Sequence, residues 1–205
     1  MRIGRIIIAL LLLPLNFILA LGVIRNFSYV KELQHGEVVF LAGFTAYLLL
    51  HFILYRPVFM HVMAHELTHA FWAFLFGGKV KSLNVSHEGG SVTMTKSNVF
   101  VTLAPYFFPL YTALILIIYF ITDKKYLDFI IFLLGFTYSF HLALTLYSLK
   151  QKQTDLKEYG FLFSLMLIFL ANIIVFAGIA AVVSKQFSYL NFLNEAWKYT
   201  EGLLK

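Results

Sequence analysis

The chain has 205 residues, of which 60% are hydrophobic, 18% aromatic and only 13% charged, and its mean hydropathy is +0.82. This composition excludes a soluble globular domain, where about half of the residues are apolar, and is typical of a membrane protein. The net charge of +6 comes from Lys and Arg residues scattered along the chain, so we expect no nucleic-acid partner. Cysteine is absent from the sequence, so any metal site has to use His, Asp or Glu side chains.

Six apolar runs are long enough to cross a bilayer, which takes roughly 20 residues per helix. They cover residues 6–24, 38–55, 58–76, 99–121, 127–149 and 161–183. The sequence therefore predicts an all-α polytopic membrane protein with about six transmembrane helices, in contact with the lipid bilayer. Arg2 and Arg5 precede the first run as in a signal peptide, but the run is longer than an ordinary signal sequence and we expect an uncleaved span.

Two further segments have the patterns of other elements. Residues 79–86 and 91–95 are β-branched or alternating and flank Glu88-Gly89-Gly90, so we expect a short β-hairpin after the third span. From Gln186 onward, large apolar residues recur at helical spacing among polar ones. This spacing predicts a C-terminal amphipathic helix at the membrane interface.

The predicted elements divide the chain into three parts. Residues 1–57 hold two N-terminal transmembrane helices, and residues 58–185 form a membrane core of four helices with the hairpin in residues 79–97. Residues 186–205 form the interfacial tail. The length leaves no room for a second folded domain beside about six spans.

The third run contains a pattern with metal-binding chemistry. It reads His65-Glu66-Leu67-Thr68-His69, so two imidazoles lie one turn apart on one helix face, close enough to share a zinc ion. Glu66 lies beside that face, where it can act as a general base on water activated by the metal. Imidazole and carboxylate groups are costly in a membrane helix unless they are paired, which favours a metal site over a chance occurrence of the pattern.

A catalytic zinc site usually has three protein ligands, so the third must come from elsewhere in the sequence. Asp155, just before the sixth run, is the candidate, because the parity of the spans puts it on the same side of the membrane as the His69 end of the third run. Two histidines are alternatives: His61 extends the same helix face by one turn, and His141 lies in the fifth run. The residues alone leave this choice open.

Together these features resemble the site-2 protease family of intramembrane zinc metalloproteases, and the chain is similar to its small, compact bacterial members. The matching features are the His-Glu-Leu-Thr-His segment in a membrane helix, the Gly77-Gly78 break with its hairpin, the stretch Leu103-Ala104-Pro105-Tyr106, and the later Asp155. The resemblance covers approximately residues 58–183 and implies that His65, His69 and Asp155 hold one Zn²⁺ ion. The family usually has Asn-Pro-Asp-Gly-like or Leu-Asp-Gly around this Asp, whereas this chain has Thr154-Asp155-Leu156-Lys157.

The resemblance implies an enzyme with Glu66 as its catalytic residue. Its reaction would be hydrolysis of a peptide bond within or near a transmembrane segment, and its partner a membrane protein or peptide substrate. We expect the hairpin to hold this substrate in extended form as an added strand. The implied location is the cell membrane, with several spans and an active site that opens toward the cytoplasm. The alternative is a non-catalytic, metal-binding membrane scaffold or a small transporter, because intramembrane His and Glu also serve ion pathways.

Overall fold

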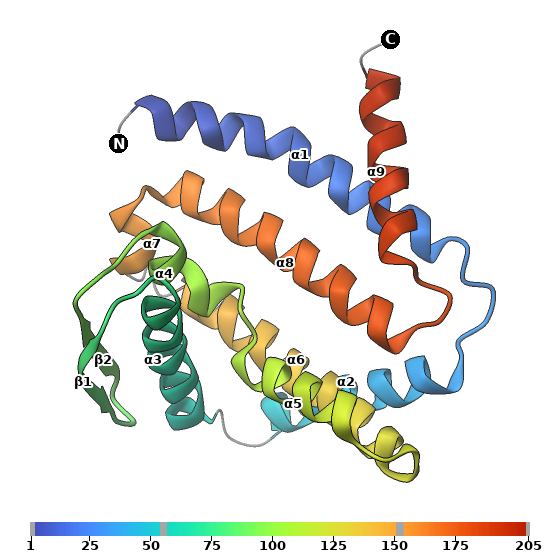
Figure 1. Cartoon of the computed structure of the whole chain (residues 1–205), viewed down its shortest axis with the longest axis horizontal. Helices are drawn as coiled ribbons and strands as arrows, with labels where there is room; N and C mark the ends of the chain where they lie inside the picture. Colours follow the sequence, from blue (N-terminus) through green and yellow to red (C-terminus); the bar gives the residue numbers. More distant parts are fainter. Residues whose placement is uncertain (1–2, 54–56, 151–153, 204–205) are drawn as a thin grey trace. The chain divides into compact units, whose positions relative to one another are not determined.

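A computed structural model of the chain describes residues 3–53, 57–150 and 154–203. The described residues are mostly helical (Figure 1). The helices are α1 (Ile3–Phe27), α2 (His35–Ile53), α3 (Val58–Leu75), α4 (Val99–Leu103), α5 (Leu110–Ile121), α6 (Leu127–Lys150), α7 (Thr154–Glu158), α8 (Phe161–Val183) and α9 (Tyr189–Leu203). The other elements are the 3-10 turns η1 (Ala104–Tyr106) and η2 (Lys124–Tyr126) and the strands β1 (Val80–Val85) and β2 (Gly90–Met94).

Four helical segments among the described residues are long and apolar enough to cross a membrane: α1, α2, α8, and η2 together with α6. A fifth span results if residues 99–106 and 110–121 count as one, although the two pieces are bent by 80°. The prediction of a polytopic helical membrane protein with one hairpin is confirmed, and the predicted count of six is approximate. The predicted end of the second span at Tyr55 lies outside the described residues.

The third predicted span, α3, is the least apolar of the six. It has 18 residues, which is long enough to approach the thickness of the hydrocarbon core. Three histidines and one glutamate lower its mean hydropathy, so α3 does not qualify as a span by composition alone. The polar residues that mark α3 as a candidate site are thus the same ones that reduce its apolar character.

The chain forms two compact units. One comprises residues 1–38 and 156–205, and the other comprises residues 39–155. The three parts expected from the sequence are the N-terminal helices, the membrane core and the interfacial tail. They do not correspond to these two units, and the three-part division stays a prediction.

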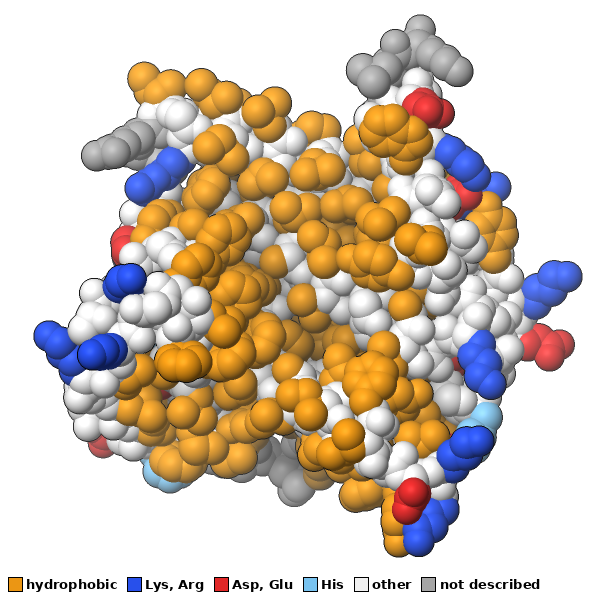
Figure 2. Space-filling model, viewed as in Figure 1, with side chains coloured by type: hydrophobic (Ala, Val, Ile, Leu, Met, Phe, Trp, Pro, Cys, Tyr) orange, Lys and Arg blue, Asp and Glu red, His pale blue; other side chains and the backbone are white. Residues whose placement is uncertain are grey.

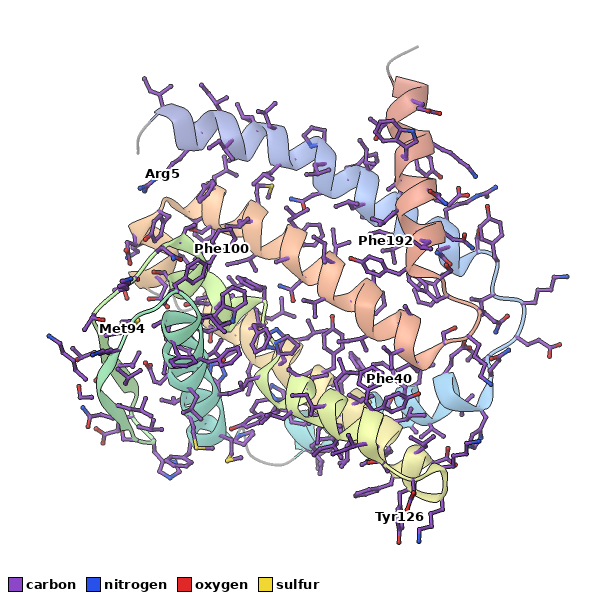
Figure 3. All side chains as sticks on the ribbon, in the orientation of Figure 1. Arg5, Phe40, Met94, Phe100, Tyr126 and Phe192 are labelled. Atoms are coloured by element: carbon purple, nitrogen blue, oxygen red, sulfur yellow. The ribbon has the colours of Figure 1, made fainter. Side chains whose placement is uncertain are left out.

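Helices α1, α8 and α9 build the unit of residues 1–38 and 156–205. Phe192 is fully buried and extends from α9 toward α8 (Figure 3), in a cluster that includes Ile18 of α1 and Ala177 of α8. A Cβ atom on Gly22 would lie 2.9 Å from the carbonyl oxygen of Phe192, so α1 and α9 approach closely at this glycine. Hydrophobic side chains cover the outer face of α1 (Figure 2), as expected for a helix in contact with lipid.

Helices α2 and α6 make a close contact in the unit of residues 39–155. A Cβ atom on Gly43 would meet the carbonyl group of Phe132, and one on Gly135 would meet the carbonyl group of Phe40. Small residues at such a crossing allow two membrane helices to approach backbone to backbone. The two glycines therefore fix how α2 packs on α6.

Replacing Gly135 with Ala is expected to destabilise the protein by about 1–3 kcal/mol, because the added methyl group overlaps the backbone of α2. Gly178 of α8 is the matched control, since a Cβ atom there meets nothing within 4 Å. Thermal unfolding in detergent compares the two variants. Equal midpoints for Gly135→Ala and Gly178→Ala would contradict the close α2–α6 contact.

A Schellman motif ends α3 and starts the connection to the hairpin. The N–H of Gly77 donates to the carbonyl of Phe74, the N–H of Gly78 donates to that of Ala73, and both distances are 2.8 Å. Gly77 has φ +70°, a left-handed conformation that favours glycine. The Gly77-Gly78 break noted in the sequence is therefore a specific helix terminus.

The hairpin confirms the element predicted within residues 79–97. Strands β1 and β2 pair antiparallel, with Val80 opposite Met94 and Val85 opposite Gly90, and with an irregularity between Val80 and Ser82. The N–H of Ser86 donates to the carbonyl of Gly89 at 2.9 Å and closes the turn. Both strands contact α3 (Figure 1), so the hairpin lies beside the helix that carries the His-Glu-Leu-Thr-His segment.

Candidate metal centre

Three side chains from two helices place their donor atoms together. His65 and His69 come from α3 and Asp155 from the first turn of α7. The Nε2 atoms of the two histidines are 3.2 Å apart, and Oδ2 of Asp155 lies 3.3 Å from Nε2 of His65 and 3.6 Å from Nε2 of His69. In the part of the chain that the structure describes, this is the group of His and carboxylate residues that could hold a metal ion.

The separations of these donor atoms fit a tetrahedral zinc site. Donors at about 2.0–2.1 Å from a tetrahedral zinc ion lie about 3.3–3.4 Å from one another. The three distances of 3.2, 3.3 and 3.6 Å scatter around that value. Two imidazoles and one carboxylate are also a donor set that zinc commonly takes, with a fourth position left open.

Residues from α4 and η1 orient two members of the cluster. Nδ1 of His69 lies 2.8 Å from the carbonyl oxygen of Val101, which only accepts, so this nitrogen carries the proton and Nε2 keeps its lone pair for the cluster. The hydroxyl of Tyr106 donates to Oδ2 of Asp155 at 3.0 Å. Val101 and Tyr106 are both fully buried, so neither contact depends on a mobile surface group.

The bend between α4 and α5 brings Val101 and Tyr106 to the cluster. The side chain of Asn98 caps α4 by accepting from the backbone N–H groups of Phe100 and Val101, at 2.9 and 3.0 Å. The helix then tightens to the 3-10 turn that contains Pro105, and α5 starts after Pro109. Proline lacks the N–H that a continuous helix would need at these positions. The predicted 99–121 span is therefore broken next to Tyr106, which contacts Asp155.

Tyr106 and Val101 have no role that the sequence predicted. The stretch Leu103-Ala104-Pro105-Tyr106 was noted only as a match to the family, and its proline inside an apolar run is the signal that could have pointed to a break. The contacts themselves depend on the 80° bend, which apolar composition does not reveal. For Val101 the contact uses a backbone carbonyl, so its side chain gave no signal at all.

Asp155 is held in its ionised form by its neighbours. Burial raises the pKa of this carboxyl group, but the imidazoles of His65 and His69 beside it, in their protonated form, outweigh burial and hold the pKa well below its usual range. A deprotonated carboxylate is the form that binds a metal ion. Asp155 is therefore ready to act as a ligand at neutral pH.

Glu66 is buried at the contact between α3 and the hairpin, with 8% of its surface exposed. A Cβ atom on Gly90 would lie 2.6 Å from Cγ and 3.0 Å from Oε1 of Glu66. Only glycine lets the start of β2 approach this carboxylate so closely. The hairpin thus lies directly against the residue expected to be the general base.

The two alternative histidines lie apart from the cluster. Nε2 of His61 lies 2.8 Å from the hydroxyl oxygen of Ser148, and the ring centroids of His61 and His65 are 6.1 Å apart. His141 and His61 line a small cavity of about 20 Å³ beside His65. The geometry groups Asp155 with His65 and His69, the two histidines of the motif. The role of Glu66 as general base and the roles of these three residues as metal ligands stay predictions.

Comparison with known families decides where the chain belongs. The sequence model described as Peptidase M50B-like matches residues 38–201. The chain belongs to this family. The resemblance to the site-2 proteases is thereby confirmed, and the match extends beyond the expected residues 58–183 to include most of α2 and α9. Neither a curated protein nor a solved structure matches the chain.

Family membership and composition together give a coarse functional assignment. The family indicates a peptidase, and the four or five apolar spans among the described residues indicate that it is a membrane protein. Members of this family are zinc metalloproteases, and the cluster of His65, His69 and Asp155 could hold a metal ion.

Proposed function

We propose that this protein is an intramembrane zinc metalloendopeptidase that hydrolyses a peptide bond within or near a transmembrane segment of a membrane protein or peptide. The observation that carries the proposal is the tetrahedral spacing of the three donor atoms in a chain of a peptidase family. One Zn²⁺ ion per chain would be held by His65, His69 and Asp155. Zinc in such a site supplies Lewis acidity, which polarises a carbonyl group and makes water acidic enough to be deprotonated near neutral pH.

The residues of this chain then have distinct tasks. Glu66 takes the proton from the attacking water onto its carboxylate and afterwards gives it to the nitrogen of the leaving amine. Val101 fixes the ring of His69, and Tyr106 fixes the carboxylate of Asp155, so neither donor group has to be oriented during the reaction. The cost of ordering the site is met when the protein folds.

The hairpin supports a substrate held in extended form. A helical substrate has its carbonyl groups in internal hydrogen bonds, so the segment must unwind before attack. In the part of the chain that the structure describes, the sheet has two strands, so each strand has one edge without a strand partner, where an added strand could pair. Because Gly90 of β2 lies against Glu66, a strand added beside β2 would pass closer to the general base than one added beside β1.

We also propose that the active site opens toward the cytoplasm. Lys79, Lys81 and Lys96 lie in or next to the hairpin, and basic side chains gather at this place on the surface (Figure 2). Loops on the cytoplasmic side of membrane proteins carry an excess of Lys and Arg. The charge of the hairpin therefore favours the same side as the family resemblance.

Removal of the metal tests the proposed function directly. Incubation of the detergent-purified protein with a zinc chelator is expected to remove close to one zinc per chain and to abolish cleavage of a model transmembrane peptide, because the proposed reaction requires the metal. Adding back zinc should restore both. Elemental mass spectrometry and gel analysis of the peptide provide the two measurements.

Two other outcomes of this experiment would contradict the proposed function. Unchanged cleavage by zinc-free protein would overturn it. Stoichiometric zinc without cleavage of any transmembrane peptide would support the metal-binding scaffold instead.

A further inference from the structure

The unit of residues 39–155 contains a second cavity, which is large and apolar. It lies among α2, α3, α5 and α6 and has a volume of about 630 Å³. This volume is in the range of cavities that bind small molecules or large side chains. Leu50, Met60 and Leu114 line it and are 42%, 42% and 50% exposed, so the cavity opens at the lipid-facing surface.

The cavity borders the small cavity beside the metal centre. Tyr111, Thr137 and Phe140 line both this cavity and the small cavity that reaches His65. The hydroxyl of Tyr111 donates to the carbonyl of Met60 at 3.0 Å, which holds this shared side chain in place between α5 and α3. The two cavities therefore share a wall that leads from the lipid-facing surface to a candidate ligand.

The axial separation of Met60, which lines the cavity, and His65 corresponds to a short stretch of extended peptide. Met60 precedes His65 by five residues of α3, which is about 7.5 Å along the helix axis. An extended chain advances about 3.3 Å per residue. A side chain seated beside Met60 would thus belong to a residue about two positions from the bond that is cleaved.

The lining of the cavity defines which side chains it can accept. None of the described residues that line it is Lys, Arg, Asp or Glu, and most are Leu, Ile, Met or Phe. A carboxylate or ammonium group placed there would lose its hydration without a Lys, Arg, Asp or Glu partner among the described lining residues. A large aliphatic or aromatic side chain would exchange contact with lipid for close packing in a shaped cavity.

We propose that this cavity is a specificity subsite, which receives a large apolar side chain of the substrate about two residues from the cleaved bond. The proposal rests on the proposed function and adds a selection rule to it. A lipid acyl chain would also suit an apolar lining, but lipid binding would not require the cavity to lie next to the metal centre. The position of this cavity next to the one that His65 lines therefore favours a peptide occupant.

The test measures peptide binding separately from cleavage. The probe is a poly-leucine transmembrane peptide that has one variable position and a photoreactive group beside it. It is cross-linked in detergent to the Glu66→Gln protein, which is expected not to cleave it. Peptides with Phe, Leu, Ala or Asp at the variable position are compared. Leu114→Trp fills the cavity, whereas Ile117→Trp adds the same side chain to α5 at a residue that is 63% exposed and does not line the cavity.

We expect Leu114→Trp to weaken binding of the Phe peptide at least about tenfold and to leave the zinc content unchanged, because the indole takes the space in which the large side chain of the peptide would be buried. Ile117→Trp should bind like the parent protein. Cross-links to the Phe and Leu peptides should map to residues that line the cavity, and the Asp peptide should bind weakly.

Equal binding to Leu114→Trp and Ile117→Trp, or no dependence on the variable residue, would overturn the subsite. Occupation by a photoreactive phospholipid that the Phe peptide does not displace would also overturn it, in favour of a bound lipid. If the parent protein cleaves the peptides but binding does not depend on the variable residue, the subsite is refuted and the proposed function is not. If binding depends on the variable residue but the zinc-loaded parent protein cleaves none of the peptides, the proposed function is refuted and the subsite is not.

Discussion

Replacing Glu66 with Gln is expected to reduce peptide cleavage by a factor of about 10²–10⁴ and to leave close to one zinc per chain. Glutamine has the shape of glutamate, so the buried contact with Gly90 is kept. Its amide cannot accept a proton from water at neutral pH, so the general base is lost while the donor atoms stay in place. Initial rates of cleavage and elemental analysis of the same preparation provide the measurement.

Glu32→Gln is the matched control for the loss of a carboxylate. Glu32 is exposed in the segment between α1 and α2 and has no part in the cluster. This variant should cleave and bind zinc like the parent. Full cleavage by Glu66→Gln would contradict the mechanism, whereas loss of zinc from that variant would assign Glu66 to the metal site rather than to proton transfer.

The second large effect concerns the third ligand. Asp155→Ala is expected to lower the zinc content to near zero at micromolar zinc and to abolish cleavage, because it removes one of three donors that lie 3.2–3.6 Å apart. Tyr106→Phe removes only the hydrogen bond to Asp155 and should weaken zinc binding about 10–100-fold. Titration with zinc, monitored by elemental analysis after desalting, orders the variants.

Three controls test the assignment of Asp155. Asp123→Ala removes an exposed loop carboxylate and should leave zinc binding unchanged. His61→Ala and His141→Ala should also keep the metal, because neither histidine lies in the cluster of donor atoms. Retention of zinc by Asp155→Ala together with its loss from one histidine variant would contradict the assignment and move the third ligand to that histidine.

The sequence by itself determined the features that depend on local patterns. Helical periodicity put His65 and His69 one turn apart whatever the rest of the chain does, because 3.6 residues per turn bring positions four apart to the same face. Alternation around Glu88-Gly89-Gly90 likewise predicted the hairpin, which forms from neighbouring residues. Apolar composition predicted a membrane protein, since the bilayer acts as solvent for most of its surface.

Only the tertiary structure decided how distant segments meet. Asp155 follows His65 by 90 residues, and parity could give its side of the membrane but no distance. The roles of Tyr106 and Val101 depend on an 80° bend inside a run that reads as one continuous apolar span. The approach of Gly90 to Glu66 depends on the packing of the hairpin on α3. Hydropathy records how much of a segment is apolar, whereas contacts between segments follow from backbone direction and side-chain shape, which become fixed only when the helices pack.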